Sequence, residues 1–146
     1  MQYHLLKFIS NLISLLPYRA VLWLGKWLMG PLYYRIAAKQ RRRAIAQLKE
    51  SLSCSDADAD RIVRSLFVKL GQTFLEILHS PALTPDNISD YIIIENRHYL
   101  ADALERGKGV VLLTAHIGNW EWLGAALAMD GFPMATVVKR QPNDQH

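Results

Sequence analysis

Apolar residues recur every three to four positions near the N-terminus, which is the spacing of one face of an α-helix. Over residues 5–16 this stripe consists of Leu5, Ile9, Leu12 and Leu16. Pro17 follows, and a proline at this point is expected to end the amphipathic helix. The next stretch, residues 20–34, is apolar on nearly all sides and carries only one charge, on Lys26. The pattern therefore predicts two helices in the first part of the chain.

The second stretch is also aromatic, and Trp and Tyr side chains favour the interface between a membrane and water. Its aromatic residues are Trp23, Trp27, Tyr33 and Tyr34. A helix that crosses a membrane needs roughly 18 to 20 apolar residues in succession. Three charged residues interrupt the apolar pattern before that length is reached, namely Lys7, Arg19 and Lys26. We therefore expect an interfacial helix or a shallow hairpin, and no secretory cleavage site is evident.

Basic residues gather directly after this apolar stretch, at Arg35, Lys39, Arg41, Arg42 and Arg43. Such a cluster is typical of a cytoplasmic juxtamembrane segment, although a solvated helix face is the alternative. Nucleic acid is not an expected partner, because no aromatic residues are interleaved with the basic ones and no recognition motif follows. Residues 1–50 are thus predicted to be a membrane-associated helical N-terminus, with the rest of the chain in the cytosol.

From residue 51 onward, helical spacing alternates with short apolar runs. Ser55 and Asp58 form a plausible capping box at the start of a long helix that Pro81 and Pro85 follow. The runs 91–95, 110–114 and 135–138 have the length of strands, and helices are expected between them at 99–106 and 119–129. This alternation predicts βαβ units with a parallel sheet. The expected fold class is α/β, with residues 51–146 as the N-terminal part of the α/β domain.

Composition adds limits to this picture. The chain has 146 residues, enough for one core and too few for two domains of ordinary size. With 51% apolar and 21% charged residues, it does not have the composition of a disordered chain. Its net charge of +4 suits anionic lipid, nucleic acid or an acidic carrier protein without choosing among them. Cys54 is the single cysteine, which excludes an internal disulfide and a multi-cysteine metal site.

The candidate chemistry lies in residues 114–121, Thr-Ala-His-Ile-Gly-Asn-Trp-Glu. Ligands of α/β sheets bind beyond the carboxyl ends of the strands, where His116 is expected. In one regular helix, five residues correspond to about 500°, so His116 and Glu121 would not share a face. If Gly118 allows a tight turn and Asn119 caps the following helix, Glu121 lies in the first helical turn and can reach back. His116 is then a general base whose imidazole the carboxylate orients.

Other interpretations of the same residues remain open. A histidine after a buried strand can bond a neighbouring carbonyl, and Glu121 favours the helix dipole whatever its function. The sequence has no G-x-S-x-G elbow, so a covalent acyl-serine route finds no support. The dyad would instead deprotonate a substrate hydroxyl that attacks an acyl thioester directly. The spacing also differs from that of a zinc-binding H-E-x-x-H helix, and neither a metal nor a cofactor is expected.

Residues 107–121, Gly-Lys-Gly-Val-Val-Leu-Leu-Thr-Ala-His-Ile-Gly-Asn-Trp-Glu, resemble the first signature block of the lipid A biosynthesis lauroyl/myristoyl acyltransferases. These belong to a wider glycerolipid acyltransferase-like group that shares a histidine, four residues and an acidic residue. The form H-x-G-N-W-E is much more specific than the spacing alone. The resemblance extends to the apolar N-terminus, the cluster Arg41-Arg42-Arg43, the long helix after it and the segment 137–140.

The resemblance implies an inner-membrane enzyme that transfers a fatty acyl chain to a hydroxyl of a lipid A precursor. The donor would be acyl carrier protein or coenzyme A, with His116 as base and Glu121 as its partner. Asn119, Lys139 and Arg140 are the candidate substrate-binding residues, the last two facing an anionic head group. Solvated residues at a strand end are the alternative for Lys139 and Arg140.

Two departures from the family pattern limit the assignment. Family members are longer, and their later blocks with further arginines are absent, so the chain is expected to be the N-terminal half of such an enzyme. Residues 44–52 also lack an expected asparagine-leucine pair, which leaves the subfamily open. The alternatives are a truncated, non-catalytic, membrane-associated fragment, or an acyltransferase that acts on another glycolipid or a lysophospholipid.

Overall fold

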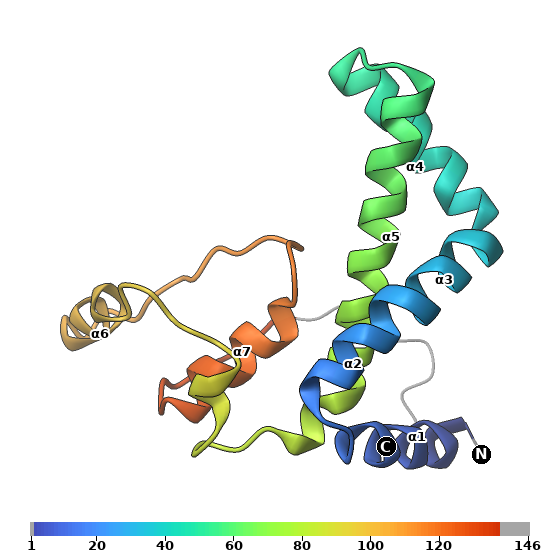
Figure 1. Cartoon of the computed structure of the whole chain (residues 1–146). Helices are drawn as coiled ribbons and strands as arrows, with labels where there is room; N and C mark the ends of the chain where they lie inside the picture. Colours follow the sequence, from blue (N-terminus) through green and yellow to red (C-terminus); the bar gives the residue numbers. More distant parts are fainter. Residues whose placement is uncertain (1, 138–146) are drawn as a thin grey trace.

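The computed structural model describes residues 2–137, and their regular elements are all helical (Figure 1). The N-terminal part contains α1 (Gln2–Ser14), α2 (Tyr18–Leu24), the π-helical turn η1 (Gly25–Met29), α3 (Gly30–Ile36) and α4 (Ala38–Leu52). After it come α5 (Asp56–His79), the short 3-10 turns η2 (Ser80–Ala82) and η3 (Ile88–Asp90), α6 (His98–Glu105) and α7 (Trp120–Met129).

The expected α/β fold with a parallel-sheet core is wrong for the described part of the chain, which forms no strand between residues 2 and 137. The run 91–95 begins in a turn, because the backbone N–H groups of Tyr91 and Ile92 both donate to the Ile88 carbonyl. The run 110–114 forms no regular structure, and Val111 and Leu113 are each 94% exposed. An apolar run has the side chains of a strand, yet a sheet also needs a neighbouring backbone for its hydrogen bonds. The run 135–138 lies partly outside the described residues.

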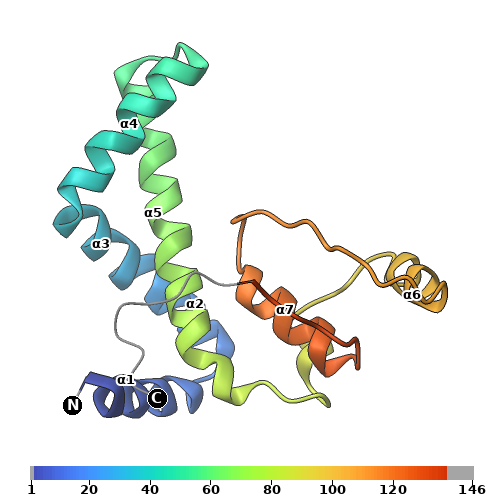
Figure 2. The ribbon, with the colours of Figure 1, turned by 180° about the vertical axis from the view of Figure 1, so that it is seen from behind.

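Helix α5 is the longest element, and it contacts each of the N-terminal helices (Figures 1 and 2). Its start is capped as predicted, because the Ser55 hydroxyl accepts a hydrogen bond from the backbone N–H of Asp58 at 3.1 Å. One face of the helix is buried along its whole length, at Ala59, Val63, Phe67, Gly71, Leu75 and Leu78. This apolar face at helical spacing holds the N-terminal helices together.

The closest approach in this assembly brings η1 and the start of α3 against the middle of α5. Gly71 of α5 faces Gly25 and Gly30, and a Cβ atom at Gly71 would lie 2.4 Å from the Gly30 backbone nitrogen. A Cβ at Gly25 would likewise lie 2.6 Å from the Cα of Gln72. No real Cβ atom fits at such distances, so the two backbones approach this closely only because glycines lie at the contact.

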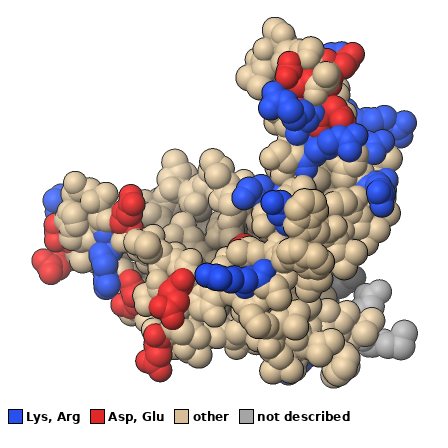
Figure 3. Space-filling model, viewed as in Figure 1, with Lys and Arg blue, Asp and Glu red and all other residues tan. Residues whose placement is uncertain are grey.

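Tyr34 connects α3, α4 and the upper part of α5. The guanidinium groups of Arg41 and Arg64 lie over its ring, 4.8 and 4.5 Å from the ring centroid. Its hydroxyl donates to Asp60, which also pairs with Arg64 at 2.6 Å. Arg41 of the predicted basic cluster therefore takes part in packing. Figure 3 shows that Lys and Arg side chains gather in the upper part of the view, where α4 and the start of α5 lie.

The C-terminal elements form a second group beside α5, with α7 closest to it and α6 farther away (Figures 1 and 2). Helix α7 packs on the loop after α5 through a buried cluster that consists of Leu83, Ile88, Trp122 and Ala126. Arg97, next to α6, pairs with Asp130 at the end of α7 at 3.3 Å. Within residues 2–137, no helix combines the length and apolar character needed to cross a membrane.

The glycine contact predicts opposite effects for two Gly-to-Ala substitutions. Gly71→Ala should lower the free energy of unfolding by about 2 kcal/mol or more, because a methyl group there overlaps backbone that cannot move aside. Gly124→Ala, in the middle of α7 with no atom within 4 Å of its Cβ position, is the matched control. It should be neutral or raise stability by up to about 1 kcal/mol, because alanine favours helix. Urea denaturation of the two variants measures the difference, and equal effects would contradict the contact.

Candidate active site

The segment with the candidate catalytic residues enters α7 through a bend. Residues 116–118 form the bend, and Gly118 has a φ of 63°, a left-handed conformation that glycine adopts without strain. Asn119 is the N-cap of α7, and Glu121 lies in the first helical turn. The local path predicted from the sequence is therefore confirmed: His116 precedes the helix, Asn119 caps it, and Glu121 follows within it.

His116 and Glu121 are both exposed at this end of α7. The imidazole of His116 contacts the indole of Trp120, with ring centroids 4.4 Å apart and planes inclined by 51°. Among the hydrogen bonds of the described residues, none joins His116 to Glu121. The two side chains thus share the N-terminal end of one helix, and their action as an acid-base dyad stays a prediction.

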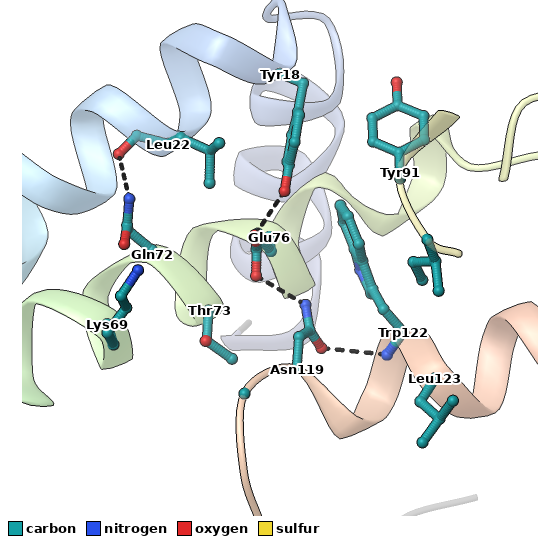
Figure 4. Close-up of a pocket in the computed structure, with 12 residues that line it drawn as sticks. Tyr18, Leu22, Lys69, Gln72, Thr73, Glu76, Tyr91, Asn119, Trp122 and Leu123 are labelled. Carbon is teal, nitrogen blue, oxygen red and sulfur yellow. Dashed lines mark hydrogen bonds between the residues drawn. The ribbon is translucent and has the colours of Figure 1, made fainter. Parts of the chain in front are cut away.

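Asn119 is held at both ends of its side-chain amide (Figure 4). Its Oδ1 accepts a hydrogen bond from the backbone N–H of Trp122 at 3.1 Å, which caps α7. Its Nδ2 donates to Oε2 of Glu76 on α5 at 3.1 Å. The predicted role of Asn119 in substrate binding remains untested. Lys139 and Arg140, the other two candidates, lie outside the described residues.

The second oxygen of Glu76 is also engaged. Oε1 accepts a hydrogen bond from the Tyr18 hydroxyl at 2.7 Å, so Glu76 joins α2 to the cap of α7 (Figure 4). Burial, and then the hydrogen bond to Glu76, raise the pKa of the Tyr18 hydroxyl well above its ordinary value. Tyr18 therefore keeps its proton at neutral pH and remains a donor.

Trp122 makes a second attachment between α7 and the end of α5. Its side chain is 3% exposed, and its Nε1–H donates to the Ser80 hydroxyl at 2.9 Å. Its ring packs against Tyr18 and Tyr91, with centroid distances of 5.8 and 5.7 Å. The first turn of α7 is thus fixed to α5 by two side chains, Asn119 and Trp122. Trp122 is thus a packing residue.

A pocket of about 450 Å³ opens beside this network. Its polar lining residues are Tyr18, Lys69, Gln72, Thr73, Glu76, Tyr91 and Asn119 (Figure 4). Gly118 also lines it, so the pocket adjoins the bend, whereas His116 and Glu121 are not among its lining residues. The pocket can receive a hydrogen-bonding group close to the candidate base.

The sequence interpretation missed Tyr18 and Glu76. A signal was present, because polar residues on α5 recur with the spacing i, i+3, i+4 and i+7, at Lys69, Gln72, Thr73 and Glu76. This is a polar stripe along a largely apolar helix, which indicates a face turned toward a pocket or a polar partner. The spacing alone does not say which element lies opposite.

The comparisons with known proteins agree with the motif. Residues 2–145 match the family described as bacterial lipid A biosynthesis acyltransferase, and the chain belongs to this family. The chain is also similar to a phosphatidylinositol mannoside acyltransferase of Mycolicibacterium smegmatis, with 27% identity over 81 residues. These residues are 56% of this chain and 27% of that relative, so the chain matches about a quarter of the relative's length. No solved structure matches the chain.

The raised pKa of Tyr18 predicts how stability depends on alkaline pH. A tyrosine in the unfolded chain loses its proton near pH 10, whereas folded Tyr18 keeps it to higher pH. The stabilisation is therefore complete below the unfolded pKa and is lost as the pH rises toward the folded one, by up to about 1.4 kcal/mol per pH unit. Tyr18→Phe should show a shallower fall between about pH 10 and 11.5.

The measurement is urea denaturation at a series of pH values, with Tyr3→Phe as a control that removes an exposed phenol and leaves Glu76 untouched. Parallel curves for Tyr18→Phe and the unaltered protein would contradict the assignment.

Proposed function

We propose that the protein transfers a fatty acyl chain from an acyl thioester to a hydroxyl of a glycolipid, with His116 as the general base. The observation that carries this proposal is the family match, which includes the bend and the start of α7. The exposure of His116 supports it further, because a base must reach the substrate hydroxyl.

In the proposed reaction, the imidazole of His116 removes the proton of the acceptor hydroxyl as its oxygen attacks the thioester carbonyl. The tetrahedral intermediate then collapses, the carbon–sulfur bond breaks, and the leaving thiolate receives the proton from the imidazolium. Glu121 would bond the other ring nitrogen and stabilise the imidazolium, which is the role of the carboxylate in a catalytic triad. No acyl group is attached to the protein in this route.

An apolar groove offers a place for the acyl chain. It has a volume of about 410 Å³ and lies between α3 and α5, where Leu32, Tyr33, Leu70 and Phe74 are among its lining residues. Trp120 also lines it, and the ring of Trp120 contacts the imidazole of His116. A chain in the groove would therefore end close to the base, which suits a donor whose reactive carbonyl lies at the end of an apolar tail.

The acceptor is proposed to be a glycolipid, because the family is described for lipid A biosynthesis and the relative for phosphatidylinositol mannoside. A lipid A precursor is our first candidate, with acyl carrier protein or coenzyme A as the acyl carrier. Mass spectrometry of lipids from cells with and without the gene identifies the acceptor. Loss of one acyl chain from a mannoside, or accumulation of a lysophospholipid, with lipid A unchanged, would replace that candidate.

We further propose that the N-terminal helices bind the surface of the inner membrane from the cytoplasmic side. Large apolar side chains are exposed along α1, α2 and η1, including Phe8, Leu12, Trp23 and Trp27. Arg42 and Arg43 of α4 are exposed as well. An apolar surface next to a basic one suits a bilayer with anionic head groups.

Substitution of His116 tests the proposed function. His116→Ala should lower acyl transfer by about 1,000-fold or more, because the only general base of the proposed reaction is removed. The fraction of protein in the membranes should stay unchanged. His98→Ala, which removes an exposed histidine of α6, is the control and should keep full activity. The measurement is transfer of a radiolabelled acyl chain in isolated membranes.

Substantial transfer by His116→Ala would exclude His116 as the base. Absence of transfer by the unaltered protein, under conditions where the lipid analysis shows the product in cells, would instead favour a non-catalytic role for this chain.

A further inference from the structure

We propose that Glu76 is a positioning residue for the candidate base: through Asn119 it fixes the bend that carries His116. This inference rests on the proposed function and adds a residue of α5 to the site, 40 positions before His116. It follows from the contacts on either side of the bend.

The chain before the bend does little to hold His116 in place. In the described part of the chain, residues 108–118 make one backbone hydrogen bond outside regular helices, from Ile117 to Ala115, and this bond is local. Residues 110–118 are all exposed. The first residue after His116 that is bonded to a distant part of the chain is Asn119. The position of the imidazole therefore depends on Asn119 and on the ring contact with Trp120.

Asn119 can perform this task only in one orientation of its amide. Its Oδ1 must accept from the Trp122 N–H, and its Nδ2 must then face an acceptor, because an amide nitrogen only donates. Glu76 provides that acceptor, and its other oxygen is occupied by the Tyr18 hydroxyl. The carboxylate thus fixes the amide, and the amide fixes the start of α7.

The same contacts distinguish Glu76 from a base or a substrate ligand. Both of its oxygens accept hydrogen bonds from this chain, one from α2 and one from the cap of α7. A displacement of about 1 Å in a catalytic group can slow an enzyme by roughly 100-fold without loss of substrate binding. Glu76 is therefore expected to affect turnover more than the affinity for substrate.

An exchange of the two side chains tests the inference. Glu76→Gln alone leaves one acceptor oxygen for two donors, so the Tyr18 hydroxyl must turn to accept from the new amide nitrogen, and the hydrogen bonds at position 76 lose the carboxylate charge. Asn119→Asp alone keeps the cap of α7 but places two carboxylates together. The double variant restores the whole network. Its new amide at position 76 accepts from Tyr18 and donates to the new carboxylate at position 119, which also accepts from the Trp122 N–H.

Asn119→Asp should lower kcat by about 10-fold to 100-fold, with KM for the acyl donor changed by less than about 3-fold. Glu76→Leu, which removes both acceptor oxygens, should do the same, and Glu76→Gln should cause a smaller loss. The double variant should recover kcat to within about 3-fold of the unaltered protein. Tyr18→Phe removes only one of the two hydrogen bonds to Glu76 and should give a milder loss. Glu50→Gln, the same chemical change at an exposed site of α4, should leave kcat unchanged.

The experiment uses the whole protein in membranes. Thermal unfolding of each variant is measured as well, so that activities are compared for equal amounts of folded protein. Full activity of Glu76→Leu beside an active unaltered protein would overturn this inference alone. A double variant no more active than Asn119→Asp would do the same, because the exchange restores every hydrogen bond of the network. No His116-dependent transfer by the unaltered protein would overturn the proposed function, and this inference with it.

Discussion

The close backbone contact between α5 and the segment that joins α2 to α3 is the constraint on which the rest of the structure depends. Gly71 lies against Gly25 and Gly30, where no side chain fits, and this contact sets how closely α2 and α3 approach α5. Because α2 is held there, Tyr18 at its start comes within hydrogen-bonding distance of Glu76. The same glutamate receives Asn119 from α7. Packing in the N-terminal half thereby determines where the candidate base is placed.

Much of the helical structure follows from sequence spacing. Pro17 separates the first two helices as expected, and the cap at Ser55 starts α5 where the pattern predicts. The predicted strands do not form between residues 2 and 137, because a strand depends on more than local spacing. Residues 110–114 have the composition of a buried strand, but burial and pairing depend on what lies beside the backbone. In the described chain nothing pairs with this segment, and its apolar side chains are exposed.

The candidate site shows the same difference between local contacts and contacts that join distant segments. The order of bend, cap and first helical turn is local, so Gly118, Asn119 and Glu121 could be placed from their types and spacing. The support for that order is not local. Glu76 lies 43 residues from Asn119 and 58 from Tyr18, and the polar stripe on α5 gives no indication of its partners. Contacts between segments so far apart depend on tertiary packing, which a pattern along one helix does not record.

Two surfaces meet at the start of α7 and suit the chemistry of the family. The apolar groove between α3 and α5 is lined in part by Trp120, and the polar pocket beside Glu76 is lined in part by Gly118. In the proposed reaction the acyl donor is apolar and the glycolipid head group is polar, so the two surfaces match the two proposed substrates. If His116 is the base, the anchoring of the bend is as important as the identity of its histidine.

Hydrogen–deuterium exchange of the Trp122 backbone amide shows whether Glu76 anchors this bend. That amide donates to Asn119 and so reports whether the cap is in place. If Glu76 anchors the bend, Glu76→Leu should speed exchange in the first turn of α7 and leave the middle of α5 unchanged. Exchange at Trp122 that is the same in both proteins, or that rises equally throughout the chain, would contradict it.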